Sequence, residues 1–172
     1  MKKVLMTLFV MFAVVTAYAQ EMYVVGGISL WRNHDAERTT FSISPEFGYG
    51  LNEKWSVGGQ LILDVNGGNG SSTTAFALAP YARFSYYENS IVRLFLDMGI
   101  GVSINKTKNS DADAGFELGV KPGIAIKLND NFSFVSKVGF AGFRQDYRGA
   151  NNSGFGVYAD GEAISIGIEY AF

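Results

Sequence analysis

Hydrophobic residues alternate with polar or small residues along nearly the whole chain after residue 20, and helical spacing is almost absent. This period-two alternation predicts β-strands with one apolar face. Eight segments show it, at residues 22–31, 39–49, 55–65, 74–86, 91–104, 115–128, 132–143 and 156–172. Their lengths suit tilted strands that cross a bilayer, which need roughly 9–11 residues each.

The connections between these segments are of two kinds that alternate along the chain. Three are short turns, at residues 51–54, 87–90 and 129–131. Four are longer and more polar, at residues 33–38, 66–72, 105–113 and 144–154. Short turns at one end of a sheet and long loops at the other are typical of outer-membrane barrels, whose turns face the periplasm and whose loops face outward.

The two faces of the predicted strands differ in size. In segment 91–104 one face carries large apolar residues from Val92 to Ile104, and the other carries residues such as Arg93, Asp97 and Gly99. An eight-stranded barrel has an interior just wide enough for side chains to fill, so it cannot contain the bulky face of every strand. That face must therefore meet lipid, and the sheet must close because no water pairs with the backbone there. The prediction is an all-β fold, an eight-stranded antiparallel up-and-down transmembrane β-barrel.

The first residues predict export. Lys2 and Lys3 precede an apolar run over residues 4–15, and Ala17 and Ala19 supply small residues for cleavage. This order is typical of a secretory signal peptide, and the run is too short for a membrane helix. We expect residues 1–19 to be the signal and residues 20–172 to be the barrel.

Composition excludes several classes of function. The chain has no Cys, which removes disulfides, a thiol catalyst and a lipid-bearing cysteine. Without Lys2 and Lys3, 12 basic residues face 16 acidic ones, a net charge of −4. No basic patch of the kind that binds nucleic acid is present, so we predict no nucleic-acid partner.

Aromatic residues gather at the two ends of the predicted strands, which predicts girdles at the two membrane interfaces. Those near the short turns are Tyr49, Trp55, Phe84, Tyr86, Tyr87, Phe132, Phe134, Tyr170 and Phe172; those near the long loops are Trp31, Phe41, Phe143 and Tyr147.

Three segments share a motif, a Pro followed by alternating large residues that run into a short turn: "PEFGYGL" at 45–51, "PYARFSY" at 80–86 and "PGIAIKL" at 122–128. With the signal peptide and the terminal "YAF", the chain resembles the small outer-membrane β-barrel proteins of Gram-negative bacteria. It is similar to the OmpX-like and OmpA-barrel group, especially the forms common in Bacteroidota. The resemblance implies an eight-stranded barrel in the outer membrane and the use of Tyr170 and Phe172 as a signal to the barrel assembly machinery. It implies no single activity.

The prolines of this motif require a local irregularity. Pro45, Pro80 and Pro122 face outward by the alternation, and Pro cannot donate a ladder hydrogen bond. We expect a bulge or a missing ladder bond at each.

Charged residues on the inward faces are equal in number of each sign. The set is Glu46, Asp64, Arg83, Arg93, Asp97, Glu117, Lys121, Lys127, Lys137 and Glu169. Because an isolated charge in a narrow lumen costs several kcal/mol, the balance predicts a paired network that plugs the barrel. The alternative is a conduction path lined by these charges, although water-filled channels generally belong to larger barrels.

The remaining candidates for chemistry are weak. His34 lies in a polar loop without a Ser in a recognisable nucleophile context, so a lipid-modifying hydrolase is the lesser interpretation. Asp111 and Asp113 form an acidic pair, whereas calcium takes six to eight oxygen ligands. The Gly-rich loop at 66–72 lacks the Lys of a phosphate-binding loop. We predict no catalytic residues, no cofactor and no metal.

These observations predict a monomeric outer-membrane scaffold that displays four polar loops. Its expected surroundings are outer-membrane lipid and lipopolysaccharide, and its expected roles are envelope maintenance, adhesion or contact with a host or cell-surface ligand. Two alternatives stay open: a lipid A-modifying outer-membrane enzyme, and a soluble exported β-barrel that binds a small apolar ligand.

Overall fold

The computed structural model describes residues 22–33, 38–68, 71–108, 110–149, 153–159 and 164–172. The predicted signal peptide and His34 lie outside these residues. In the described part of the chain, no helix has the length and apolar character required to cross a membrane.

The described chain runs back and forth eight times, and four of the passes are interrupted, so that twelve strands result. The interrupted passes are β1 (Met22–Gly26) with β2 (Ile28–Asn33), β3 (Arg38–Ile43) with β4 (Glu46–Gly50), β9 (Phe132–Val138) with β10 (Phe140–Gln145), and β11 (Ser153–Tyr158) with β12 (Ile164–Ala171). The continuous ones are β5 (Trp55–Gly68), β6 (Ser71–Glu88), β7 (Val92–Thr107) and β8 (Ala112–Lys127). A short 3-10 helix, η1 (Tyr147–Gly149), follows β10.

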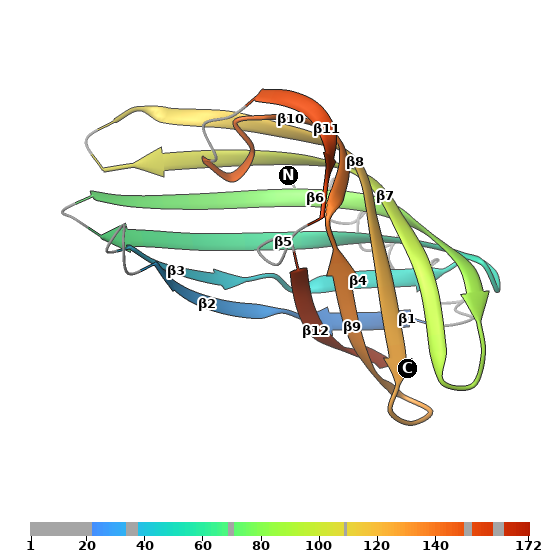
Figure 1. Cartoon of the computed structure of the whole chain (residues 1–172). Coiled ribbons are helices and arrows are strands. Elements are labelled where there is room, and N and C mark those ends of the chain that lie inside the picture. Colours follow the sequence, from blue (N-terminus) through green and yellow to red (C-terminus); the bar gives the residue numbers. More distant parts are fainter. Residues whose placement is uncertain (1–21, 34–37, 69–70, 109, 150–152, 160–163) are drawn as a thin grey trace, which may run out of the picture.

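Each pass pairs antiparallel with the next, and the last returns to the first (Figure 1). The closing ladder joins β1 to β12 and runs from Tyr23 opposite Ala171 to Gly26 opposite Ile168. Among the described residues, β2 pairs with β3 and β11 pairs with β10, so the closing ladder lies in the half of the barrel near the short turns. The predicted eight-stranded antiparallel up-and-down barrel is confirmed.

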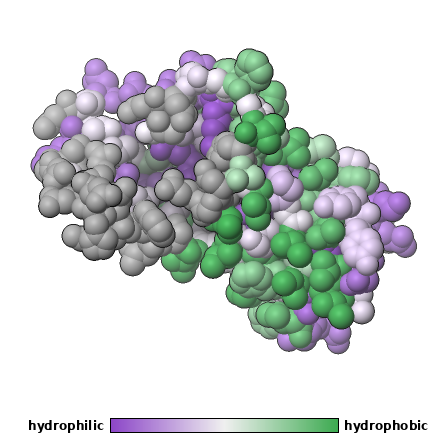
Figure 2. Space-filling model, viewed as in Figure 1, coloured by the Kyte–Doolittle hydropathy of each residue, from purple (hydrophilic) through white to green (hydrophobic). Residues whose placement is uncertain are grey.

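The apolar faces point outward. Leu61 on β5, Leu78 on β6 and Leu118 on β8 are 47%, 46% and 51% exposed, whereas Ala75 and Ala77, which alternate with the outward residues of β6, are buried. Figure 2 shows apolar side chains gathered across the wall, with polar side chains toward the ends. A closed barrel that presents leucine and isoleucine on all sides matches hydrocarbon as its solvent, as the volume argument predicted.

Each of the three short turns is built around an asparagine. The Oδ1 atoms of Asn52, Asn89 and Asn129 each accept two backbone N–H groups, those two and three residues further along the chain, at 2.7–3.0 Å. This side-chain mimic of a backbone turn is a common property of asparagine. The same local chemistry therefore repeats at one end of the barrel.

The strands continue further than predicted at the other end. β5 to β8 have 14, 18, 16 and 16 residues, and residues 66–68 and 71–72 of the predicted Gly-rich loop belong to strands. The prediction of a long loop at 66–72 was therefore wrong. Apolar alternation ends where lipid ends, but the backbone ladder continues with polar side chains beyond it.

The three prolines interrupt the sheet as expected. Pro45 lies in the gap between β3 and β4, and the β6–β7 ladder skips the Pro80 position between Leu78 and Tyr81. Near Pro122 the pairing of β8 passes from β10 to β9 with one extra residue on the partner side. All three prolines are exposed.

That extra residue is Gly139, which has a φ of 74° and separates β9 from β10. Before it, Val135 and Lys137 are buried and Val138 is exposed; after it, Phe140 is buried and Phe143 is exposed. The inward positions therefore change from odd to even numbers at Gly139. A positive φ at this point favours glycine.

The outward orientation of the leucines yields a stability prediction. Replacing Leu78 by Arg places a guanidinium in the hydrocarbon and is expected to lower the free energy of unfolding by about 2–4 kcal/mol. Ser90→Arg, in an exposed short turn, serves as the control and should change it by less than about 1 kcal/mol. Urea unfolding in lipid vesicles, followed by tryptophan fluorescence, measures both. Equal effects would contradict the lipid-facing assignment.

Candidate functional site: a charged lumen below a polar cup

Arg83 on β6 is the centre of the lumen and is 1% exposed. Its Nε and Nη2 atoms donate to the two carboxylate oxygens of Asp97 on β7, at 2.7 and 2.9 Å. Nη2 also donates to Glu46 on β4 at 2.8 Å, and Nη1 donates to Glu169 on β12 at 3.3 Å. One guanidinium thus joins carboxylates from three other passes of the barrel.

Two further cations contact the same carboxylates, and together these six residues form what we call the Arg83 level of the lumen. Arg93 Nη2 donates to Glu169 at 2.5 Å. Lys137 Nζ lies 2.6 Å from a Glu46 oxygen and 2.8 Å from an Asp97 oxygen. Three cations therefore face three carboxylates, so the net charge of this level is zero. Charge-assisted hydrogen bonds of this kind offset the cost of burying each ion.

Aromatic rings enclose the guanidinium of Arg83. Its Cζ lies 4.0 Å from the ring centre of Phe95, 5.0 Å from that of Tyr23 and 5.3 Å from that of Tyr81. The two tyrosine hydroxyls are 3.0 Å apart, and Tyr81 donates to Glu46 at 2.6 Å. The cation is thus held by ring faces as well as by carboxylates.

Each of these rings lies over a glycine on the neighbouring strand. Tyr23 is paired with Gly48, Tyr81 with Gly58 and Phe95 with Gly123. A Cβ at these glycines would lie 2.0, 2.5 and 2.3 Å from the nearest ring or hydroxyl atom. Glycine is therefore required sterically where the narrow lumen accommodates a ring.

A second charge group lies closer to the long-loop end. Glu117 on β8 accepts from Lys121 at 2.6 Å and from Arg144 on β10 at 2.5 Å. The Cζ of Arg144 also lies 4.2 Å from the ring centre of Phe140. The void between this group and the Arg83 level measures about 20 Å³, which is room for about one water molecule.

Above this group, the turn that contains η1 folds into the barrel. Arg148 Nε and Nη2 donate to the two oxygens of Asp64 on β5 at 2.5 and 2.8 Å, and Ser42 donates to the same carboxylate at 2.5 Å. Tyr147 is 2% exposed and forms a buried hydrophobic cluster with Ile62 and Ala77. Burial raises the pKa of Tyr147 to about 12, so its hydroxyl stays neutral.

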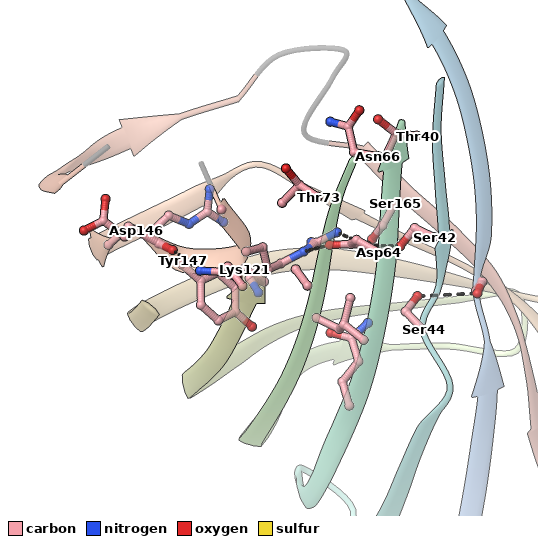
Figure 3. A pocket seen from close by; sticks show the side chains of 18 of the residues that line it. Thr40, Ser42, Ser44, Asp64, Asn66, Thr73, Lys121, Asp146, Tyr147 and Ser165 are labelled. Atoms are coloured by element: carbon pink, nitrogen blue, oxygen red, sulfur yellow. Dashed lines mark hydrogen bonds and ion pairs between the residues drawn. The ribbon is translucent and has the colours of Figure 1, made fainter. Parts of the chain in front are cut away.

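The inserted turn borders a polar cavity of about 830 Å³, which we call the cup (Figure 3). Hydroxyl and amide side chains dominate its wall, with Asp64, Lys121 and Tyr147 among the residues drawn. The wall further includes Thr40, Ser42, Ser44, Gln60, Asn66, Thr73, Asn105, Thr107 and Ser165. The cup lies on the long-loop side of the charge levels, so the lumen combines a polar hollow with a filled floor.

In the structure, nine of the ten predicted lumen charges form ion pairs inside the barrel. The tenth, Lys127, lies at the edge of the barrel. Lys127 pairs with Glu88 at 2.5 Å near the short turns, and both side chains are about one-third exposed, at 32% and 39%. Asp64 pairs with Arg148, a residue outside the predicted set. The predicted network is thus three separate groups, with one member at the barrel's edge.

The terminal aromatics face outward near the short turns. Tyr170 lies 4.9 Å, between ring centres, from both Phe132 and Phe172. Phe172 donates its backbone N–H to Met22 at 2.9 Å, which ties the end of the described chain to β1. Tyr147, which was predicted in the opposite girdle, instead points into the lumen.

Asp111 and Asp113 are exposed, and Asp113 lies on the wall of the cup. In the described part of the chain, no group of three or more His, Cys, Asp or Glu side chains has the geometry to hold a metal ion.

Sequence reasoning missed six residues that contribute side chains to the lumen groups. They are Tyr23, Tyr81, Phe95, Tyr147, Arg144 and Arg148. For Tyr23, Tyr81 and Phe95 the sequence contained a usable signal: each lies at an inward position of its strand and is paired with a glycine on the neighbouring strand. Arg144 and Arg148 were both placed in the predicted loop at 144–154, and had the strand been extended to Arg144, the alternation without the change of parity at Gly139 would have turned it outward.

Comparison with known proteins shows a likeness of fold to solved structures. No protein-family model matches the chain, and no curated protein matches it. Three solved structures illustrate the likeness. Ail, the attachment invasion locus protein of Yersinia pestis, has a TM-score of 0.52 at 15% identity, over 90% of this chain and 99% of that one. OprG, an outer-membrane protein of Pseudomonas aeruginosa, has 0.54 at 13%, over 90% and 96%.

The third is a major outer-membrane protein of Thermus thermophilus, with a TM-score of 0.54 at 11% identity, over 88% of this chain and 99% of that one. The chain therefore has the fold of bacterial outer-membrane barrels. Together with the lipid-type exterior, this supports the predicted outer-membrane location.

The central position of Arg83 yields a second stability prediction. Arg83→Met leaves three buried carboxylates facing two cations and is expected to cost about 3–5 kcal/mol of unfolding free energy. Lys127→Met removes an exposed ion pair and should cost less than about 1 kcal/mol. Urea unfolding in detergent micelles measures both, and similar losses would contradict the dominance of the Arg83 group.

Proposed function

We propose that this protein is a non-enzymatic outer-membrane scaffold whose lumen is sealed by paired charges and whose outer connections serve envelope maintenance, adhesion or surface interaction. The observation that carries the proposal is the filling of the lumen at Arg83. The guanidinium, the three carboxylates and the ring of Phe95 are all buried there. A barrel filled in this way has no room for a water-filled path, so its functional surface is the outer end.

The outer end has the features of an interaction surface. Strand extensions with polar side chains carry the connections beyond the apolar band, and rigid strands position loop tips for recognition. Ail, which shares the fold, is an attachment invasion locus protein by name. We propose outer-membrane lipid, lipopolysaccharide and the barrel assembly machinery as partners, and a monomer as the working form.

A conductance measurement tests the sealed lumen. Wild-type protein in planar bilayers is expected to show no large, stable ion currents. Arg93→Ala should lower the thermal midpoint while leaving conductance nearly unchanged, because Arg93 contributes to the filled level at Glu169. Large, stable wild-type currents would contradict the plug.

A labelling experiment tests the display of the outer connections. The chain contains no Cys, so a single introduced thiol reports its own location. Ser110→Cys, in the connection between β7 and β8, should react with a membrane-impermeant maleimide on intact cells. Asp130→Cys, in a short turn, is the matched control and should react only after the outer membrane is opened. The reverse result would contradict the proposed orientation.

A further inference from the structure

Two lysines stand on the outside of the barrel where the apolar band ends. Val102 and Ile104 on β7 are 51% and 62% exposed, and Lys106 has the same parity. The intervening residues Ser103 and Asn105 are buried in the lumen wall. Lys106 therefore points outward, one strand repeat of about 7 Å beyond Ile104.

Lys108 continues this outward row just past the end of β7. It is exposed, and its backbone N–H donates to the carbonyl of Ser72 at 2.8 Å, which fixes it beside β6. On the neighbouring strand β6, Thr74 is paired with Lys106 and Phe76 is paired with Ile104. Hydroxyl groups thus lie next to the ammonium groups, and apolar side chains lie beneath them.

These side chains border a shallow groove of about 570 Å³. It is lined by Ser72, Thr74, Phe76, Ile104, Lys106, Thr107 and Lys108. One end of the groove is cationic and hydroxylated and the other is apolar. An amphiphile with an anionic head and hydrocarbon chains has the complementary pattern.

The positive charge is local to this groove. The matching outward positions of the flanking strands carry Val65 and Gly67 on β5 and Ala112 and Ala114 on β8. Within the described residues, no carboxylate pairs with either lysine ammonium. Asp113, close along the chain, lies on the cup side of the wall.

We infer that Lys106 and Lys108 form a binding site for a phosphate group of an outer-leaflet lipid, whose acyl chains lie along Phe76 and Ile104. The inference rests on the proposed function, because it needs the long-connection end to face the outer leaflet. At that depth the lipid headgroups meet the hydrocarbon, and an ammonium binds phosphate through charge-assisted hydrogen bonds. Ser72 and Thr74 supply hydroxyl donors to the same oxygens.

The test uses the full barrel refolded in a neutral detergent and phosphorylated lipid A as the probe. Native mass spectrometry gives the dissociation constant. Lys106→Gln and Lys108→Gln are each expected to weaken binding about fivefold, and the double variant about 25-fold. Lipid A stripped of its phosphates should bind the wild type as weakly as the phosphorylated form binds the double variant.

Lys54→Gln is the matched control, since Lys54 is an exposed lysine in a short turn at the opposite end. It should leave binding unchanged. An unaltered dissociation constant in the double variant, or an equal loss in Lys54→Gln, would overturn the site. A heat-dependent gel shift confirms that each variant is folded.

The two proposals fail separately. If Ser110→Cys reacts only in opened cells while lipid A binding depends on Lys106 and Lys108, the orientation is wrong and the lysines do not meet the outer leaflet. If labelling is as expected and the dissociation constant for lipid A is unchanged in the double lysine variant, only the lipid site is wrong.

Discussion

Closure of the sheet between β1 and β12 is the constraint on which the rest of this molecule depends. In hydrocarbon every backbone N–H and C=O must find a partner within the protein, so the first and last passes have to pair. Closing eight strands then fixes a narrow interior. The choice of inward residues follows from that diameter, because any large or charged group must be matched by a neighbour that makes room for it or neutralises it.

The lumen satisfies this constraint in two ways. Rings are accommodated by glycine on the adjacent paired strand, as with Phe95 over Gly123. Charges are accommodated by balance, since the level around Arg83 carries three ions of each sign. Arg83 combines both, because its guanidinium bonds Asp97 while it lies against the face of Phe95. The filled floor and the polar cup above it are thus consequences of one geometric limit.

Sequence periodicity was sufficient for the number of strands, their orientation and the identity of most lumen charges, because lipid on one side imposes a strict alternation. It was insufficient in the parts of the strands that do not contact lipid, because nothing there imposes the alternation. Residues 66–68 and 71–72 lie beyond the apolar band, so nothing in their hydrophobicity marked them as strands. The sequence also did not show which charges pair with each other. The ion pair of Asp64 with Arg148 depends on a turn that folds into the barrel, and no spacing along the chain encodes that contact.

Gly139 shows how much one residue can decide in such a wall. It adds one residue to the seventh pass, so the odd-numbered residues point inward before it and the even-numbered residues point inward after it. If Gly139 were paired as an ordinary strand residue, the unbroken alternation would turn Arg144 toward hydrocarbon and Phe143 toward the lumen, since a one-residue slip exchanges the two faces. The residue with no side chain of its own therefore determines which solvent its six successors meet.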